Sequence, residues 1–302
     1  MLSAITRALR LTGGASDMAG DPTVNGQFGR LPLRELILES LKESEFPFYN
    51  GKDFLPCDSF ESLLTKDNIS QELSGASHEL IGFIYDNARR TFATILIVIP
   101  GFSGSALTSI MESFQRHGFD DSFLPIDGGK LVSCHSPHDC EGHATALNIF
   151  HDKSLRDHIY NFSIFQGIFI VPRFPLPKDC RRLHPGCVLP FTEFDIYSSK
   201  EDTFSKVHKA KLRVDHQQTI PRENESLEIQ VAIKKFKRKE DIDLPESEKP
   251  DVEAAWSREA DALEELSADE SDKTHNIARG IGSFSMRGDY FIIMPWASGG
   301  TL

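Results

Sequence analysis

The sequence predicts an α+β fold, in which a helical N-terminal region precedes an antiparallel sheet with one helix. Residues 30–125 repeat the apolar spacing of short amphipathic helices. From about residue 196 the pattern changes to alternating and β-branched segments, in the order strand, strand, helix, strand, strand. A chain of 302 residues has room for one large domain or two medium ones, so each part can hold a core of its own.

Composition and charge exclude several classes of function. The net charge of −12 argues against nucleic-acid binding, which needs a basic face, and weakly against an anionic membrane surface. No apolar run is long enough to span a membrane, and no secretory signal opens the chain. The 5 cysteines, without a signal peptide, indicate reduced thiols in a cytoplasmic or nuclear protein.

The first 29 residues are rich in Gly, Asp and Asn, and we expect a disordered tail there. Arg7 and Arg10 precede the first acidic residue, Asp17. A short mitochondrial presequence is therefore the alternative to a basic tail, and the tail is favoured.

The helical region, residues 30–125, is predicted to contain several short helices. The first has apolar residues at helical spacing, namely Leu33, Leu36, Ile37 and Leu41. Asp58 or Ser59 is expected to cap a later helix. Thr91–Ile99 is apolar and β-branched, so it fits either a buried helix end or a strand. A clearer amphipathic helix follows and is expected to end at Gly118.

Residues 126–195 are expected to form an irregular connector. The connector holds residues of zinc-ligand type, namely Cys134, His135, His138, Cys140, His143, Cys180, His184 and Cys187. Their spacing does not match two close cysteines followed by two histidines, so an ordinary loop is favoured and no metal site is predicted. A Cys–His nucleophile pair is a further alternative, but no third group orients it.

The last part of the chain, residues 196–302, carries the predicted sheet. Its strands are predicted over residues 204–214, 227–237, 276–285 and 289–295. A helix is predicted over residues 252–266, after an acidic, proline-containing loop. Arg287–Gly288–Asp289 is expected to form the turn between the last two strands.

One lysine in this part points to chemistry. Lys234 follows three apolar strand residues, so it faces inward or borders a pocket and needs an anionic partner. Glu259 shares one face of the predicted helix with Leu263 and Leu266, which puts a carboxylate on the side of the helix that faces the core. A Lys–Glu pair of this kind fixes the lysine to hold phosphate oxygens.

The segment "VAIKKFK", the helix glutamate and the end "YFIIMPWASGGTL" resemble the small lobe of eukaryotic-type protein kinases. The resemblance covers about residues 190–302. It implies a five-stranded antiparallel sheet with one helix, and an ATP-dependent protein kinase of the serine/threonine type. Lys234 would contact the α- and β-phosphates of ATP, and Glu259 would orient Lys234.

The same resemblance implies which residues surround the adenine. Val207 and Ala232 would sandwich the base, and Met294 would be the gatekeeper. The Pro295 carbonyl and the Ala297 amide would meet the adenine edge. Phe204 fits the loop that covers the phosphates.

That covering loop departs from the family pattern. Lys200, Asp202 and Ser205 stand where the pattern has glycines. The carboxylate of Asp202 repels a triphosphate, and its Cβ hinders close approach of the backbone. Nucleotide affinity is therefore expected to be weak.

The residues that carry out phosphoryl transfer in the family have no counterpart in the sequence. No H-R-D, D-F-G or A-P-E segment occurs, so the base and both magnesium ligands are absent. The chain is therefore expected not to catalyse by itself.

One hypothesis is a kinase whose large lobe is missing from the gene model. The alternative is a non-catalytic interaction protein that binds a partner kinase or another protein through an exposed face of the sheet. The segments "FLPCDSFESLLTKDNI", "FDDSFLPI" and "IFQGIFIVPRFP", which precede the lobe, are similar to the leader of many filamentous-fungal kinase-like proteins.

Overall fold

The computed structural model describes residues 31–47, 52–73, 75–99, 104–127, 132–133, 146–151, 153–221, 226–268 and 280–297. The chain forms two compact units. The helical unit comprises Met1–Glu43 and Gly51–Ile170, and the sheet unit comprises Ser44–Asn50 and Val171–Leu302. The expected tail and the cluster from Cys134 to His143 lie outside the described residues.

The helical unit is built from short helices. These are α2 (Leu33–Ser40), α3 (Cys57–Leu63), α4 (Lys66–Glu72), α5 (His78–Asn87), α6 (Arg89–Val98), α7 (Ser105–His117), α9 (Lys153–Arg156) and α10 (Ile159–Phe165). Two small sheets pair β1 (Lys42–Ser44) with β2 (Lys52–Phe54) and β3 (Ile126–Asp127) with β4 (Val132–Ser133). Short 3-10 turns lie at Asp121–Phe123, Asn148–His151 and Gln166–Ile168. The apolar residues of the predicted helical pattern form one core.

The open question at Thr91–Ile99 is settled as a helix. All residues of α6 from Thr91 to Val98 are buried, which explains why the segment lacks a polar face. The carboxylate of Asp121 accepts hydrogen bonds from the Arg90 and Thr91 amides, both at 2.9 Å, and so caps the start of α6. The end of α7 is confirmed at Gly118, whose φ of 66° is left-handed.

The predicted cap of α3 is wrong. The helix begins at Cys57, directly after Pro56, and no side chain caps it. Asp58 and Ser59 lie within the first turn because the fixed φ of Pro56 starts the helix before them.

The sheet unit contains one antiparallel five-stranded sheet. Its strands are β5 (Phe191–Glu201), β6 (Ser205–Arg213), β7 (Glu228–Phe236), β8 (Gly282–Met286) and β9 (Asp289–Pro295), in the order β5-β6-β7-β9-β8. Short 3-10 turns lie at Lys178–Cys180, Val214–His216, Lys239–Asp241 and Glu246–Glu248. The predicted turn before β9 is confirmed: Met286 pairs with Asp289, and Arg287 and Gly288 have φ of 54° and 79°.

Strand β5 lies where the sequence pattern predicted no strand, and it begins inside the expected connector. Only the resemblance to the kinase small lobe implied a fifth strand. Its register to β6 shifts between Phe191 and Glu193 and again between Asp195 and Lys200. These irregularities break the alternation of side chains on which the prediction depended. The helices α9 and α10 also lie in the stretch that was expected to be irregular.

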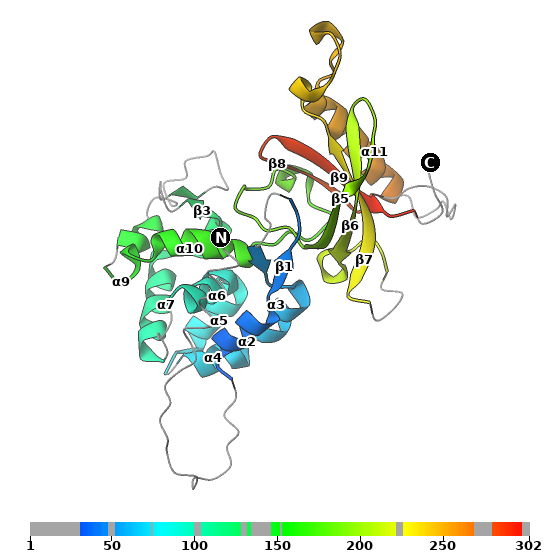
Figure 1. Ribbon diagram of the computed structural model, residues 1–302. Helices are drawn as coiled ribbons and strands as arrows, with labels where there is room; N and C mark the ends of the chain where they lie inside the picture. Colours follow the sequence, from blue (N-terminus) through cyan, green and yellow to red (C-terminus); the bar gives the residue numbers. More distant parts are fainter. Residues whose placement is uncertain are drawn as a thin grey trace. The chain divides into compact units, whose positions relative to one another are not determined.

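Helix α11 (Val252–Ala268) packs on one face of the sheet (Figure 1). Trp256 and Ala260 are buried against Phe236 and Ile292, and Leu263 is partly buried beside them. Leu266 is 47% exposed, so its predicted place in the core is wrong. The buried stripe ends at Leu263, and Leu266 lies beyond it.

The other face of the sheet is covered by chain from outside the sheet. The buried residues Phe46, Phe174 and Leu189 join the strand residues in a second core. Phe46 comes from the short segment Ser44–Asn50, which lies far upstream of the strands. This face is therefore a packed interior of the sheet unit, and the expectation that it is exposed for a partner protein is wrong.

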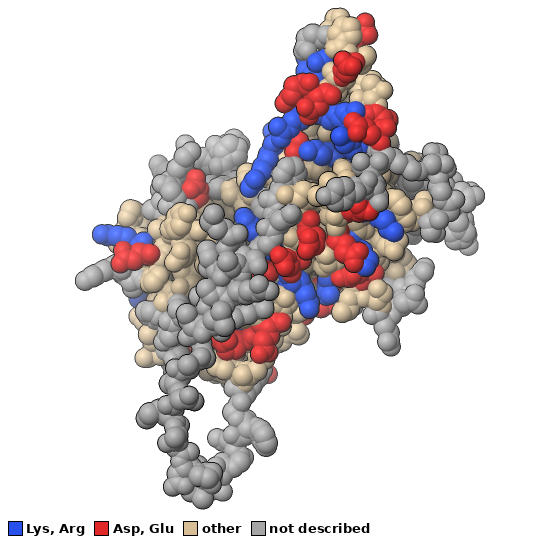
Figure 2. All heavy atoms as spheres, viewed as in Figure 1, with Lys and Arg blue, Asp and Glu red and all other residues tan. Residues whose placement is uncertain are grey.

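Charged side chains of both signs are interspersed over the sheet unit on the face shown in Figure 2. Neighbouring strands contribute ion pairs such as Lys206–Glu201 at 3.0 Å and Lys211–Glu193 at 2.5 Å.

None of the helices in the described ranges combines the length and apolar character that crossing a membrane requires.

Candidate functional site

Lys234 lies on the central strand β7 and meets a carboxylate from α11. Its Nζ is 2.7 Å from Oε1 and 2.8 Å from Oε2 of Glu259. The side chains are 23% and 36% exposed, so the pair is half-buried and open to a ligand from one side. The ion pair expected from the sequence is therefore present.

The position of Glu259 follows from how α11 is fixed to the sheet. Trp256, three residues earlier, donates from Nε1 to the carbonyl of Phe291 on β9 at 3.0 Å. Ala260, which directly follows Glu259, is buried against the same face of the sheet. These contacts turn Glu259 toward β7, where Lys234 is paired with Ile292 of β9.

The pair borders a cavity of about 270 Å³. Its lining comes from the β5–β6 hairpin, β7, α11 and the loop before α11, and comprises Asp202, Phe204, Ser205, Lys234, Phe236, Ile242, Pro250, Val252, Ala255 and Glu259. Ligand pockets usually measure about 300–1,000 Å³, so this cavity fits part of a nucleotide rather than all of it. Most of its walls are apolar, and its charged groups are Lys234, Glu259 and Asp202.

The hairpin tip over the cavity is closed by Asp202. Its Oδ1 accepts hydrogen bonds from the amides of Phe204 at 2.7 Å and Ser205 at 2.6 Å, and its Oδ2 accepts from the Ser205 hydroxyl at 3.0 Å. Partial burial raises the pKa of Asp202, but these hydrogen bonds and the charge of Lys234 outweigh burial and leave the pKa below its usual value. The Asp202 carboxylate thus accepts from the amides of Phe204 and Ser205 and from the Ser205 hydroxyl, and these donors already have a hydrogen-bond partner within the hairpin tip.

The residues expected around an adenine share a face but not this cavity. Val207 pairs with Lys234, and Ala232 pairs with Met294, so these side chains lie on the same face of the sheet. None of the three apolar residues lines the cavity, and neither do Pro295 and Ala297.

The residue after β9, Trp296, adds one more backbone hydrogen bond to strand β7. The amide of Trp296 donates to the carbonyl of Gln230 at 3.2 Å, and the Trp296 ring lies 5.3 Å from Nζ of Lys209. Pro295 and Ala297, on either side of Trp296, are exposed. The two residues that were expected to meet the adenine edge therefore lie at the surface.

The next residue, Lys235, forms an ion pair away from the cavity. Lys235 points to the opposite face, where its Nζ lies 3.1 Å from Oδ2 of the buried Asp289, which also pairs with Arg238 at 2.8 Å. The sequence did not single out Asp289, because an acid at the end of a hairpin turn is ordinary.

Three of the residues of zinc-ligand type, Cys180, His184 and Cys187, lie among the described residues. Cys180 is exposed, Cys187 is buried, and Nδ1 of His184 accepts from the amide of Gly186 at 2.9 Å. The described residues contain no group of three side chains arranged to hold a metal ion.

No protein-family model matches the sequence, and no curated protein matches it significantly.

Proposed function

We propose that the sheet unit is an ATP-binding lobe of the protein-kinase type. The observation that carries this proposal is the contact of Lys234 with both carboxylate oxygens of Glu259, at the edge of a cavity beneath a hairpin. The lysine lies on the third strand of the sheet, and the glutamate on the helix between the third and fourth strands. That order agrees with the resemblance of the sequence to the small lobe.

The pair suits an anionic ligand. A lysine ammonium carries three N–H donors, and Glu259 engages two, so a donor is left for a phosphate oxygen. The carboxylate holds the flexible lysine in one place, which lowers the entropy lost when a ligand binds. Lys234 would contact the α- and β-phosphates, and the adenine would lie along Val207, Ala232 and Met294.

The proposal is limited to binding. The sequence has no H-R-D or D-F-G segment, so a base and magnesium ligands for phosphoryl transfer are not among its residues. Assignment to the serine/threonine kinase family thus rests on resemblance. Binding of a partner protein stays the alternative proposal for the chain.

Calorimetric titration of the full chain with ATP and with adenosine tests the proposal. We expect saturable binding at one site per chain, with ATP tighter than adenosine because Lys234 interacts with the phosphates. Absence of heat and of any thermal stabilisation at millimolar ATP would contradict it and favour the interaction protein.

Replacing Asp202 by asparagine is expected to tighten ATP binding about fivefold, since removing one nearby negative charge near solvent corresponds to roughly 1 kcal/mol. Asparagine keeps an oxygen that can accept from the Phe204 and Ser205 amides, so the hairpin is preserved. Asp241→Asn, an exposed acid outside the cavity lining, is the matched control and should leave affinity unchanged. Equal affinity of wild type and Asp202→Asn would show that the phosphates do not approach the hairpin tip.

A further inference from the structure

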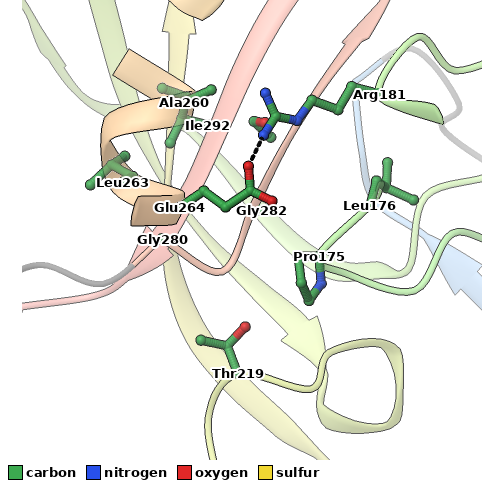
Figure 3. Close-up of a pocket in the computed structure, with 11 residues that line it drawn as sticks. Pro175, Leu176, Arg181, Thr219, Ala260, Leu263, Glu264, Gly280, Gly282 and Ile292 are labelled. Carbon is green, nitrogen blue, oxygen red and sulfur yellow. Dashed lines mark hydrogen bonds and ion pairs between the residues drawn. The ribbon is translucent and has the colours of Figure 1, made fainter. Parts of the chain in front are cut away.

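A buried arginine from outside the sheet forms ion pairs with two carboxylates of helix α11. The side chain of Arg181 is only 9% exposed. Its Nη1 lies 2.8 Å from Oδ1 of Asp261, and its Nη2 lies 2.6 Å from Oε2 of Glu264. Figure 3 shows the Glu264 carboxylate reaching from the helix to the guanidinium. Two charge-assisted hydrogen bonds from one planar group fix direction as well as distance.

The backbone of Arg181 is fixed to the sheet. The amide of Ser285 on β8 donates to the carbonyl of Arg181 at 2.7 Å, and the amide of Leu183 donates to the carbonyl of Ser285 at 2.8 Å. Strand β8 pairs with β9, and β9 pairs with β7, which carries Lys234. The backbone of Arg181 is therefore fixed, through β8 and β9, relative to strand β7 and Lys234.

The two carboxylates lie on the side of α11 opposite Glu259. An α-helix turns by about 100° per residue, so Asp261 and Glu264 point roughly 200° and 140° away from Glu259. Lys234 contacts the helix on one side, and Arg181 contacts it on the other. A rotation or slide of α11 that separates Lys234 from Glu259 also disrupts the contacts of Arg181.

The other end of the helix has its own anchors. Trp256 bonds the Phe291 carbonyl, and Tyr290 donates to Glu253 at 3.0 Å. Both lie before Glu259, so Arg181 supplies the fixed point after it. The ion pair of Lys178 with Asp261, at 3.2 Å, adds a more exposed contact at the same place.

We propose that Arg181 is a positioning residue, which holds α11 so that Glu259 meets Lys234. The segment around Arg181, which precedes the strands, would thereby control the phosphate-binding lysine. The inference rests on the proposed function for its role in ATP binding, while the effect on the Lys234–Glu259 pair is independent of a ligand.

The test measures the reactivity of Lys234 toward an amine-acetylating reagent in the full chain without nucleotide, by mass spectrometry. Arg181→Met is the main variant, because an apolar side chain of similar shape replaces a buried charge at little cost while the exposed carboxylates stay solvated. We expect acetylation of Lys234 to rise about fivefold, as for contacts coupled through shared partners. Lys206, 42% exposed on the opposite face, is the internal reference. Arg182→Met, which removes an exposed arginine paired with Glu253, is the control and should change nothing.

A double-mutant cycle separates positioning from general loosening. Glu259→Gln should raise the reactivity of Lys234 by itself, and adding Arg181→Met should then have no further effect. Independent, multiplying effects would overturn the inference, as would unchanged reactivity in Arg181→Met. If Arg181→Met does not fold, the combination of Asp261→Ala with Glu264→Ala removes both acceptors instead, at side chains that are 36% and 46% exposed.

ATP titration of the same proteins keeps this inference apart from the proposed function. If wild type binds ATP but Arg181→Met leaves both affinity and Lys234 reactivity unchanged, the positioning role is wrong and the function stands. If Lys234 reactivity rises through Glu259 but wild type does not bind ATP, the positioning role stands and the function is wrong.

Discussion

Replacing Phe46 by alanine is expected to lower the free energy of unfolding of the sheet unit by about 3–5 kcal/mol. The Phe46 side chain is fully buried, and its ring contacts four others at centroid distances of 5.3 to 6.1 Å, those of Phe191, Phe194, Phe284 and Phe291. Truncation leaves a cavity among rigid aromatic rings that cannot collapse to fill it.

Urea denaturation followed by tryptophan fluorescence measures this effect. Both tryptophans of the chain, Trp256 and Trp296, belong to the sheet unit, so the signal reports on that unit. Leu227→Ala, at a side chain that is 55% exposed, is the control and should shift stability by less than about 0.5 kcal/mol. A loss below about 1 kcal/mol for Phe46→Ala would mean that the upstream segment is not part of this core.

Replacing Lys234 by methionine is expected to weaken ATP binding about tenfold to a hundredfold. A hydrogen bond to a charged group contributes about 1.5–3 kcal/mol, which corresponds to that range of affinity. Methionine keeps much of the length of the side chain but leaves the partly buried Glu259 carboxylate without its cation and closer to the phosphates.

Calorimetric titration of the full chain provides the measurement, with Lys206→Met as the matched control. Lys206 lies close to the hairpin in sequence, but on the opposite face of the sheet, so its loss should leave affinity within a factor of about two. Equal binding by wild type and Lys234→Met would remove Lys234 from the site.

The sequence was informative where local pattern and motif coincide. Strand β7 carries an apolar, β-branched run and helix α11 a helical period, and the V-A-I-K segment placed Lys234 on the strand opposite the helix glutamate. The side chain of Leu266 was misplaced because helical spacing gives the direction of a residue but not where the neighbouring sheet ends.

Contacts between distant parts of the chain were not predictable. Ser44 and Leu189, which bond beside Phe46, are 145 residues apart, and Arg181 and Asp261 are 80 apart. A single phenylalanine or arginine in an irregular segment has no period to mark it, so its partner appears only in the folded chain. The hydrogen bonds of Asp202 were missed for a different reason. The family pattern drew attention to the missing glycines, whereas an aspartate that binds the amides two and three residues on is a local turn motif.

The most direct test of the central claim uses an ATP analogue whose terminal acyl-phosphate acylates lysine amines near the bound phosphates. Mass spectrometry then identifies the lysine that carries the label. We predict labelling of Lys234 ahead of Lys206 and Lys209, lost in the presence of excess ATP and in Lys234→Met. Labelling spread over exposed lysines and unaffected by ATP would contradict the assignment of Lys234 to a nucleotide site.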